Sequence, residues 1–384
     1  MRNTKRSGKP WAFLDDFRGT DFSGEWPTLP ELFRITAKRH PLRACFSIYD
    51  PDRISVNYTE ALERIEAVSR SLVASGLKKG ETAAVTGKNT PEWAVAYLAV
   101  LFAGGVVVPI DYQLKDEELD RLIAASKAKI LFVDEEKYSR YTERKGLDLT
   151  EIISMRRGLG KYIYNLNGPA FDAACVKGDD TAAILFTSGT MGNPKGVMLS
   201  HNNLVSDCFL SQATPLDVLY TDVFYALLPI HHAYTMLAVF IEAISQGAEV
   251  LFGKKMLVKT ILHDLKAGKV TMFLGVPMLF NKLLAAILRG LREKGIIVYG
   301  LIHFLTAVSG FIKKTFNVNP GKIMFGAILS KASLSTIRIC ISGGGPLAPS
   351  VFKKYNQLGI DFVQGYGLTE TSPIINLNPI EHYK

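Results

Sequence analysis

Short apolar runs alternate with capped amphipathic segments from residue 81 to residue 135, and this alternation is what most limits the possible folds. Residues 82–86 predict a strand. Thr90, Pro91 and Glu92 then supply a helix N-cap, a first-turn proline and an acidic first turn for a helix that runs to residue 102. Further short apolar runs follow at 106–109, 130–133, 182–186, 223–228, 249–252, 272–274 and 337–342. The alternation predicts an α/β fold with a mostly parallel sheet that binds its ligands at the carboxyl ends of the strands.

The composition is that of a globular protein with a basic surface. The chain has 384 residues, of which 48% are apolar and 21% charged, which excludes disordered, collagen-like and disulfide-scaffold proteins. Its net charge of +9 suits nucleic acid, an anionic membrane or a polyphosphate substrate, and charge alone does not choose among them. Since no nucleic-acid-binding motif is present, we expect no nucleic acid as partner. The four scattered cysteines, Cys45, Cys175, Cys208 and Cys340, predict reduced core thiols in a cytosolic protein.

The sequence TSGTMGNPKG at residues 187–196 directly follows a predicted strand and has the chemistry of a phosphate loop. Glycines let such a loop bend sharply and bring backbone N–H groups to an anion, while hydroxyls and a lysine add donors and charge. The residues concerned are Thr187, Ser188, Gly189, Thr190, Gly192, Lys195 and Gly196. The spacing differs from that of a Walker A loop, because Gly196 follows the lysine. An ordinary polar loop is the weaker alternative.

Two further glycine-rich turns follow later predicted strands. In QGYGLTETS at residues 364–372, glycines flank Tyr366, whose ring can serve as a stacking platform, and Thr369 and Glu370 offer oxygen ligands for a hard cation. Taken alone, this segment fits a tight turn equally well. SGGGP at residues 342–346 ends a strand and matches a dinucleotide-binding pattern only weakly.

Together these blocks resemble the AMP-forming adenylating superfamily of acyl- and aryl-CoA synthetases, peptide-synthetase adenylation domains and beetle-type luciferases. The resemblance covers residues 30–384 and includes six blocks in the family's order, among them LLPIHHAY at residues 227–234. It implies the large N-terminal domain of these synthetases, with layered, mostly parallel sheets, packed helices and a smaller β subdomain. It also implies ATP, Mg²⁺ and CoA as cofactors or co-substrates.

The resemblance also implies individual residue roles. Thr187, Ser188, Gly189, Thr190, Gly192 and Lys195 belong to the ATP phosphate loop, and Gly343, Gly344, Gly345, Pro346, Tyr366 and Gly367 hold adenine. Thr369 contacts the α-phosphate, Glu370 and Thr190 bind magnesium, and His232 lies between the acyl and nucleotide sites. The catalytic set is Lys195, Thr369, Glu370 and His232. Met191 stands where the family usually has threonine, which costs the loop one hydroxyl.

The histidine pair His231 and His232 has two other interpretations. Paired histidines in an apolar run are more often packed or hydrogen-bonded than metal-binding, and no third zinc ligand is spaced nearby. The position of His232 in the family block favours a pocket residue that opens and closes the acyl channel.

A long apolar stretch, residues 281–336, resembles the insertion of long-chain fatty acyl-CoA synthetases and predicts helices. Within it, residues 295–312 are uncharged but contain glycines and barely reach bilayer-spanning length. Lys294, Lys313, Lys314 and Lys322 flank this run. The pattern predicts a peripheral membrane contact through residues 295–314, at the inner face of the membrane, and a buried helical hairpin is the alternative.

The expected domain organisation is an N-terminal tail at residues 1–28 followed by an AMP-binding domain at residues 29–384. Family members continue past QGYGLTE with a small C-terminal domain, which we expect to lie outside this chain. The resulting hypothesis is a cytoplasmic, AMP-forming long-chain fatty acid:CoA ligase whose activity is impaired in this shortened chain. The alternatives are an acyl-carrier-protein ligase, an adenylating enzyme for another carboxylic acid, or a non-catalytic fragment that binds nucleotide and acyl groups.

Overall fold

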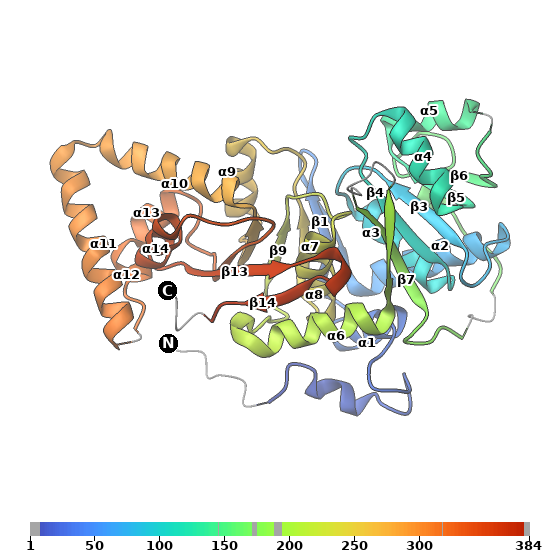
Figure 1. The fold of residues 1–384 in the computed structure, drawn as a ribbon, viewed down its shortest axis with the longest axis horizontal. Helices are drawn as coiled ribbons and strands as arrows, with labels where there is room; N and C mark the ends of the chain where they lie inside the picture. Colours follow the sequence, from blue (N-terminus) through green and yellow to red (C-terminus); the bar gives the residue numbers. More distant parts are fainter. Residues whose placement is uncertain (1–7, 145, 171–174, 188–193, 317, 380–384) are drawn as a thin grey trace.

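The computed structural model describes residues 8–144, 146–170, 175–187, 194–316 and 318–379, which form two β-sheets covered by helices (Figure 1). The six-stranded sheet has the order β6-β5-β3-β4-β7-β8. Its strands are β3 (Thr82–Thr86), β4 (Val106–Ile110), β5 (Ile130–Val133), β6 (Glu151–Ser154), β7 (Thr181–Thr187) and β8 (Lys195–Ser200). Every neighbouring pair is parallel except β7 and β8.

The eight-stranded sheet has the order β14-β13-β12-β11-β9-β10-β1-β2. Its strands are β1 (Ala44–Tyr49), β2 (Arg53–Asn57), β9 (Val223–Ala226), β10 (Glu249–Phe252), β11 (Met272–Gly275), β12 (Ile339–Ser342), β13 (Asp361–Gly367) and β14 (Ile374–Leu377). The pairs at its two edges, β1/β2 and β13/β14, are antiparallel and the inner pairs are parallel. The expected α/β fold of layered, mostly parallel sheets is therefore confirmed. The resemblance also implies a smaller β subdomain, but the described residues form no third sheet. They show only the antiparallel strand pairs at the edges of these sheets.

The helices fill the layers around the two sheets. Their bounds are α1 (Leu29–Arg39), α2 (Tyr58–Ala74), α3 (Pro91–Phe102), α4 (Asp116–Ser126), α5 (Glu135–Glu143), α6 (His201–Ser211), α7 (Ala233–Thr235), α8 (Glu242–Gln246), α9 (Val258–Ala267), α10 (Pro277–Arg292), α11 (Ile296–Phe316), α12 (Gly321–Met324), α13 (Gly326–Lys331) and α14 (Pro349–Gln357). Segments of 3-10 or π helix are η1 (Ala12–Asp16), η2 (Ile163–Asn165), η3 (Gln212–Leu216), η4 (Met236–Ile241) and η5 (Thr369–Thr371).

Helix α3 lies in the middle of the core. Thr90 caps it by accepting a hydrogen bond from the backbone N–H of Trp93, as the sequence predicts. The helix is buried on all sides instead of being amphipathic, because Trp93 and Tyr97 pack edge to face against Phe240 of η4. The η4–α8 segment thereby joins the hydrophobic core.

The predicted N-terminal tail is folded onto the core from residue 11 onward. Leu14 and Phe22 are buried, and Trp26 stacks on Phe209 of α6 with the ring centroids 5.6 Å apart. Trp11 packs against Trp26 at 5.4 Å. Separating residues 1–28 as a tail is therefore wrong for this part of it, because these aromatic side chains complete the cover of α6.

The cysteines are all free, and Cys45, Cys208 and Cys340 are buried as predicted. Cys175 is exposed, so the prediction of a core thiol is wrong there. Its neighbour Lys177 begins the polar turn before β7, which keeps the segment at the surface.

Helices α10 and α11 form an arm that extends from one end of the molecule, opposite the six-stranded sheet (Figure 1). One face of α11 packs against α14, where Lys354 donates a hydrogen bond to Thr306 and Lys313 donates one to Asn356 at 2.8 Å. The opposite face carries Ile297, Leu301, Phe304 and Phe311, each more than half exposed. The predicted insertion is helical, and the described residues leave its outer face uncovered, unlike a buried hairpin.

Candidate active site

A cavity of 530 Å³ lies where strands β4 and β7 end, at the edge of the six-stranded sheet. Parallel sheets bind ligands at the carboxyl ends of their strands, because the loops there converge. The polar residues that border the cavity are Asp111, Glu118, Arg121, Thr187, His231, His232 and Thr369. Thr187, His232 and Thr369 come from three motifs that are far apart in the sequence, so the fold brings the predicted motifs together.

A second cavity of 200 Å³ adjoins the first. His232, Ala233 and Thr369 border both, so the two cavities lie side by side and together make up the candidate cleft. The second cavity is bordered by Gly343 and Gly344 after β12, by Gly365, Tyr366 and Gly367 at the end of β13, and by apolar side chains. The two cavities thus meet at His232, and apolar atoms make up most of the lining of each.

The phosphate-loop motif spans the turn between β7 and β8. Thr187 pairs with Lys195 across these antiparallel strands. Thr187 borders the first cavity, whereas Lys195 is exposed beside it. A Cβ atom at Gly196 would lie 2.8 Å from the Ile184 side chain, so glycine is needed there. The predicted residues Ser188, Gly189, Thr190 and Gly192 lie outside the described part of the chain.

The SGGGP turn is only partly in the cleft. Gly343 and Gly344 border the second cavity. A Cβ atom at Gly343 would lie 2.8 Å from the Tyr234 ring, and Gly344 has a φ of +72°, so each position favours glycine. Gly345 and Pro346 are exposed and border neither cavity, so the structure does not place these two predicted adenine contacts at the cleft.

The QGYGLTE turn also borders the second cavity. Tyr366 is 63% exposed with its ring at the second cavity, which suits a stacking platform, and Gly367 lies beside it. Glu370 follows Thr369 in η5 and is exposed to solvent. A nucleotide-bound Mg²⁺ needs only one or two carboxylates beside phosphate and water oxygens, so a single exposed carboxylate next to Thr369 fits that ion.

The two histidines differ in environment. His231 is buried, and burial together with the neighbouring His232 ring lowers its pKa to about 4, which keeps it neutral at physiological pH. Its Nε2 atom lies 3.8 Å from Asp111 Oδ1, and the ring centroids of the two histidines are 4.1 Å apart. His232 is exposed at the junction of the two cavities. The described residues include no group of three or more potential ligands for a metal such as zinc.

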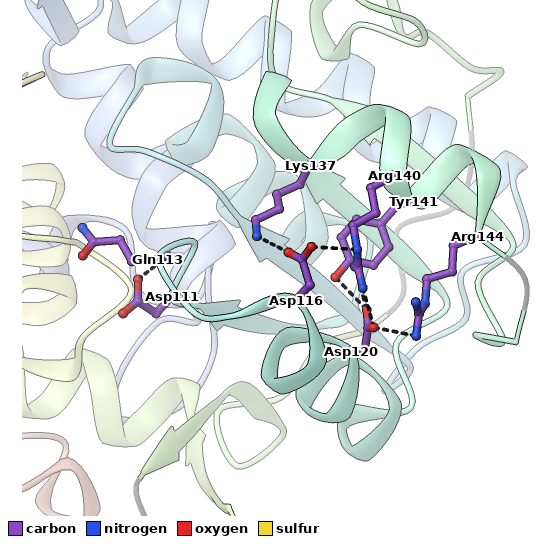
Figure 2. A network of polar contacts seen from close by, with 8 residues as sticks. All are labelled: Asp111, Gln113, Asp116, Asp120, Lys137, Arg140, Tyr141 and Arg144. Atoms are coloured by element: carbon purple, nitrogen blue, oxygen red, sulfur yellow. Dashed lines mark hydrogen bonds and ion pairs between the residues drawn. The ribbon is translucent and has the colours of Figure 1, made fainter.

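Helix α4, which carries Glu118 and Arg121 at the first cavity, is held by charged residues of α5 (Figure 2). Arg140 donates two hydrogen bonds to Asp120, at 2.9 and 2.6 Å, and Tyr141 donates a third. Burial alone would raise the pKa of Asp120, but these hydrogen bonds lower it. The ion pairs of Arg144 with Asp120 and of Lys137 with Asp116 complete the network, which fixes the cavity wall.

Several cleft residues escape prediction from the sequence. Asp111 directly follows strand β4, and that position was the one signal that could have identified it. Tyr234 and Glu242 lie in an apolar helical stretch, where nothing in the sequence separates cleft residues from core residues.

Comparisons with known proteins agree with this geometry. A family model described as AMP-binding enzyme matches residues 33–384. A long-chain-fatty-acid–CoA ligase from Bacillus subtilis is 25% identical over 97% of this chain and 65% of its own length. A chloroplastic long-chain-fatty-acid–[acyl-carrier-protein] ligase from Arabidopsis thaliana is 23% identical over 92% of this chain and 57% of its own length. The chain thus spans about three fifths of the length of these relatives.

The fold also matches solved structures. The N-terminal domain of FACL13 from Mycobacterium tuberculosis superposes with a TM-score of 0.71 at 20% identity, over 90% of this chain and 77% of that one. This match confirms the N-terminal-domain fold.

Proposed function

Because this chain belongs to the AMP-binding enzyme family, we propose that it carries the adenylating site of an AMP-forming ligase for long-chain fatty acids. The carboxylate of the acid attacks the α-phosphorus of ATP, the bond to pyrophosphate breaks, and acyl-AMP forms. The CoA thiol then loses its proton, its sulfur attacks the acyl carbon, and AMP leaves as the thioester forms. The observation that carries the proposal is the first cavity, where Thr187, His232 and Thr369 meet at the ends of parallel strands, with the second cavity beside it.

The chemistry required of the cleft is charge neutralisation. A carboxylate is already a competent nucleophile, so no general base is needed, but negative charge builds up on the α-phosphate and on pyrophosphate. Thr187 and Thr369 offer hydroxyl donors at the first cavity, and Lys195 offers a cation beside it. Mg²⁺ held by Glu370 would supply further positive charge. His232 stands where the acyl and nucleotide parts of the cleft join.

A long-chain acid is favoured by two observations. The Bacillus subtilis relative is named for long-chain fatty acids, and the helical arm exposes apolar residues that suit a lipid-handling protein.

Because the Arabidopsis relative is named for an acyl-carrier protein, the identity of the thiol acceptor needs its own test. Acid-dependent ATP–pyrophosphate exchange with a panel of carboxylic acids tests the reaction, and thioester formation with CoA or carrier protein identifies the acceptor. A protein that binds ATP and acid but catalyses no exchange would be a non-catalytic binding protein.

Nucleotide binding gives the first prediction. Lys195→Ala should weaken ATP binding about tenfold, because a charge-assisted hydrogen bond to phosphate is worth about 1.5–3 kcal/mol. Isothermal calorimetry measures the change. The matched control is Lys177→Ala, an exposed lysine near the start of β7, at the far end of the strand from the cleft. If Lys195→Ala, Lys177→Ala and the unaltered chain all bind ATP with the same affinity, the phosphate-loop assignment is wrong.

We also propose that α11 attaches the protein peripherally to an anionic membrane, at its cytoplasmic face. Among the described residues, α11 alone is long and apolar enough to cross a bilayer, with a mean hydropathy of 1.7, and it is 22% buried. Its packed face contains Thr306, Gly310 and Lys313, which a spanning helix would place in lipid. The exposed apolar face and the exposed Lys294 and Lys314 at its two ends instead suit a helix in the headgroup region.

Membrane attachment gives the second prediction. A Lys294→Glu, Lys314→Glu variant should bind anionic vesicles at least tenfold more weakly, because each cation near such a surface contributes about 1 kcal/mol. Vesicle sedimentation at low salt measures binding. Lys313 must be left intact, because its buried ammonium group is paired with Asp361 and cannot reach headgroups. Its expected role as a flanking membrane cation is therefore wrong.

The matched control for charge reversal is Lys127→Glu, an exposed lysine at the end of α4 in the six-stranded-sheet region. Its vesicle binding should equal that of the unaltered protein. If the unaltered protein ignores anionic vesicles at low salt, the apolar face of α11 has another partner and the membrane proposal fails.

A further inference from the structure

Glu242, the first residue of α8, is a buried carboxyl group beside the second cavity. Its exposed fraction is 0%. Its Oε1 atom accepts a hydrogen bond of 2.7 Å from the Ser211 hydroxyl. Within the described part of the chain, no donor or acceptor reaches its Oε2 atom. A buried polar atom without a partner is unusual, because it forfeits its hydrogen bonds to water and gains nothing in return.

The place of Glu242 along the cleft follows from its helix. Tyr234, Ala238 and Glu242 are spaced four residues apart and border the same cavity. At about 1.5 Å of rise per residue, Glu242 lies on the order of 10–15 Å beyond His232, measured along the helical run. The cavity wall around it is apolar, with Leu216, Ala238 and Ile341 among its residues.

The protonation state of Glu242 follows from its surroundings. Burial raises its pKa to about 8, the hydrogen bond from Ser211 opposes this rise, and the nearby negative charge of Asp207 adds to it. At neutral pH the group is therefore mostly the uncharged acid, which can donate as well as accept a hydrogen bond. A neutral carboxyl group in an apolar wall can lie against the uncharged hydrocarbon chain of an acid.

We propose that Glu242 selects the acid substrate by hydrogen-bonding a hydroxyl group on its chain, so that the cleft prefers a hydroxy acid to the unsubstituted acid of the same length. The inference rests on the proposed function, because it takes the helical wall of the second cavity as the acyl side of the cleft and the glycine wall as the nucleotide side. An unsubstituted chain leaves Oε2 buried without a partner, whereas a hydroxyl at the right depth satisfies it. Sites built to bond a substrate hydroxyl discriminate strongly against analogues that lack it.

The test uses stable acyl-adenylate analogues, namely dodecanoyl-sulfamoyl-adenosine and a series that carries one hydroxyl at successive chain positions. Calorimetry on the unaltered chain should show one position at which the hydroxyl improves binding on the order of tenfold. That position reports the depth of Glu242. A hydroxyl nearer the carboxyl end should weaken binding, because it meets only apolar side chains.

Two substitutions separate a hydrogen bond from a structural role. Glu242→Gln keeps a donor and an acceptor and should retain most of the preference. Glu242→Met removes both at similar volume, so it should abolish the preference and improve binding of the unsubstituted analogue. If Glu242→Met does not fold, the positional series on the unaltered chain still decides the proposal.

The outcomes distinguish this inference from the proposed function. If every analogue binds and no hydroxyl position is favoured, the inference is wrong while the adenylating site stands. If neither the analogues nor ATP bind, the proposed function is wrong and the inference falls with it. A parallel loss of ATP affinity in Glu242→Met would show that the carboxyl group contacts the nucleotide, which also overturns the inference.

Discussion

Replacing Glu370 with glutamine is expected to slow acid-dependent pyrophosphate exchange about a hundredfold. Glu370 is the exposed carboxylate that follows Thr369 at the cleft, where it would hold Mg²⁺ beside the phosphates. An amide is a much weaker ligand for a hard cation, and the positive charge matters most in the transition state, when charge builds up on the phosphates. The loss should therefore fall on kcat rather than on the KM for the acid.

A second readout does not depend on turnover. ATP affinity of the unaltered chain should rise when Mg²⁺ is added, and this rise should shrink in Glu370→Gln. The matched control is Glu117→Gln, which removes an exposed carboxylate of α4 that borders neither cavity. A Glu370→Gln variant that keeps kcat and loses only affinity for the acid would show that the residue has another role.

Replacing Lys313 with methionine is expected to lower the free energy of unfolding by about 2 kcal/mol. Lys313 is 6% exposed, and its Nζ atom lies 2.9 Å from Asp361 Oδ1 and 2.8 Å from Asn356 Oδ1. Removing the buried lysine leaves the Asp361 carboxylate, whose side chain is 31% exposed, with only water and, among the described residues, the Asn319 amide as partners. The lost ion pair and hydrogen bonds therefore cost stability, but less than in a fully buried pair. The contact ties the arm helix α11 to the start of β13, so its loss should loosen the whole arm.

Denaturant unfolding measures the change, and Lys314→Met is the matched control because Lys314 is the exposed neighbour. The control should stay within about 0.5 kcal/mol of the unaltered protein. Adding Asp361→Asn to Lys313→Met should restore part of the loss, because it removes the uncompensated carboxylate. Equal stability of the two lysine variants would mean that the ion pair contributes nothing measurable.

The elements of the fold could be predicted closely wherever local signals were strong. The cap at Thr90 and the apolar run at residues 82–86 predicted α3 and β3 with the bounds that the structure has. The turns of the cleft were also visible, since Gly196 and Gly343 are glycines that close contacts require. The local sequence pattern could not predict which polar residues would lie near these turns in the folded protein.

The errors share one physical origin. Lys313 and Lys314 have the same residue type and adjoining positions, yet only Lys313 meets Asp361, which lies 48 residues further along the chain. Likewise, Trp26 looked like part of a tail until Phe209 of α6 supplied a surface for it to stack on. In each case the deciding partner is distant in sequence.

The sequence by itself determined the α/β class, the position of most strands and the motifs that assign the chain to its family. Each of these depends on propensity, capping and hydrophobic periodicity, which act over a few neighbouring residues. Only the tertiary structure decided that Thr187, His232 and Thr369 share one cavity and that Glu242 is buried with an unpartnered oxygen beside it. Those outcomes depend on how distant elements pack, and burial, ion pairing and pKa are set by that packing rather than by the neighbours along the chain.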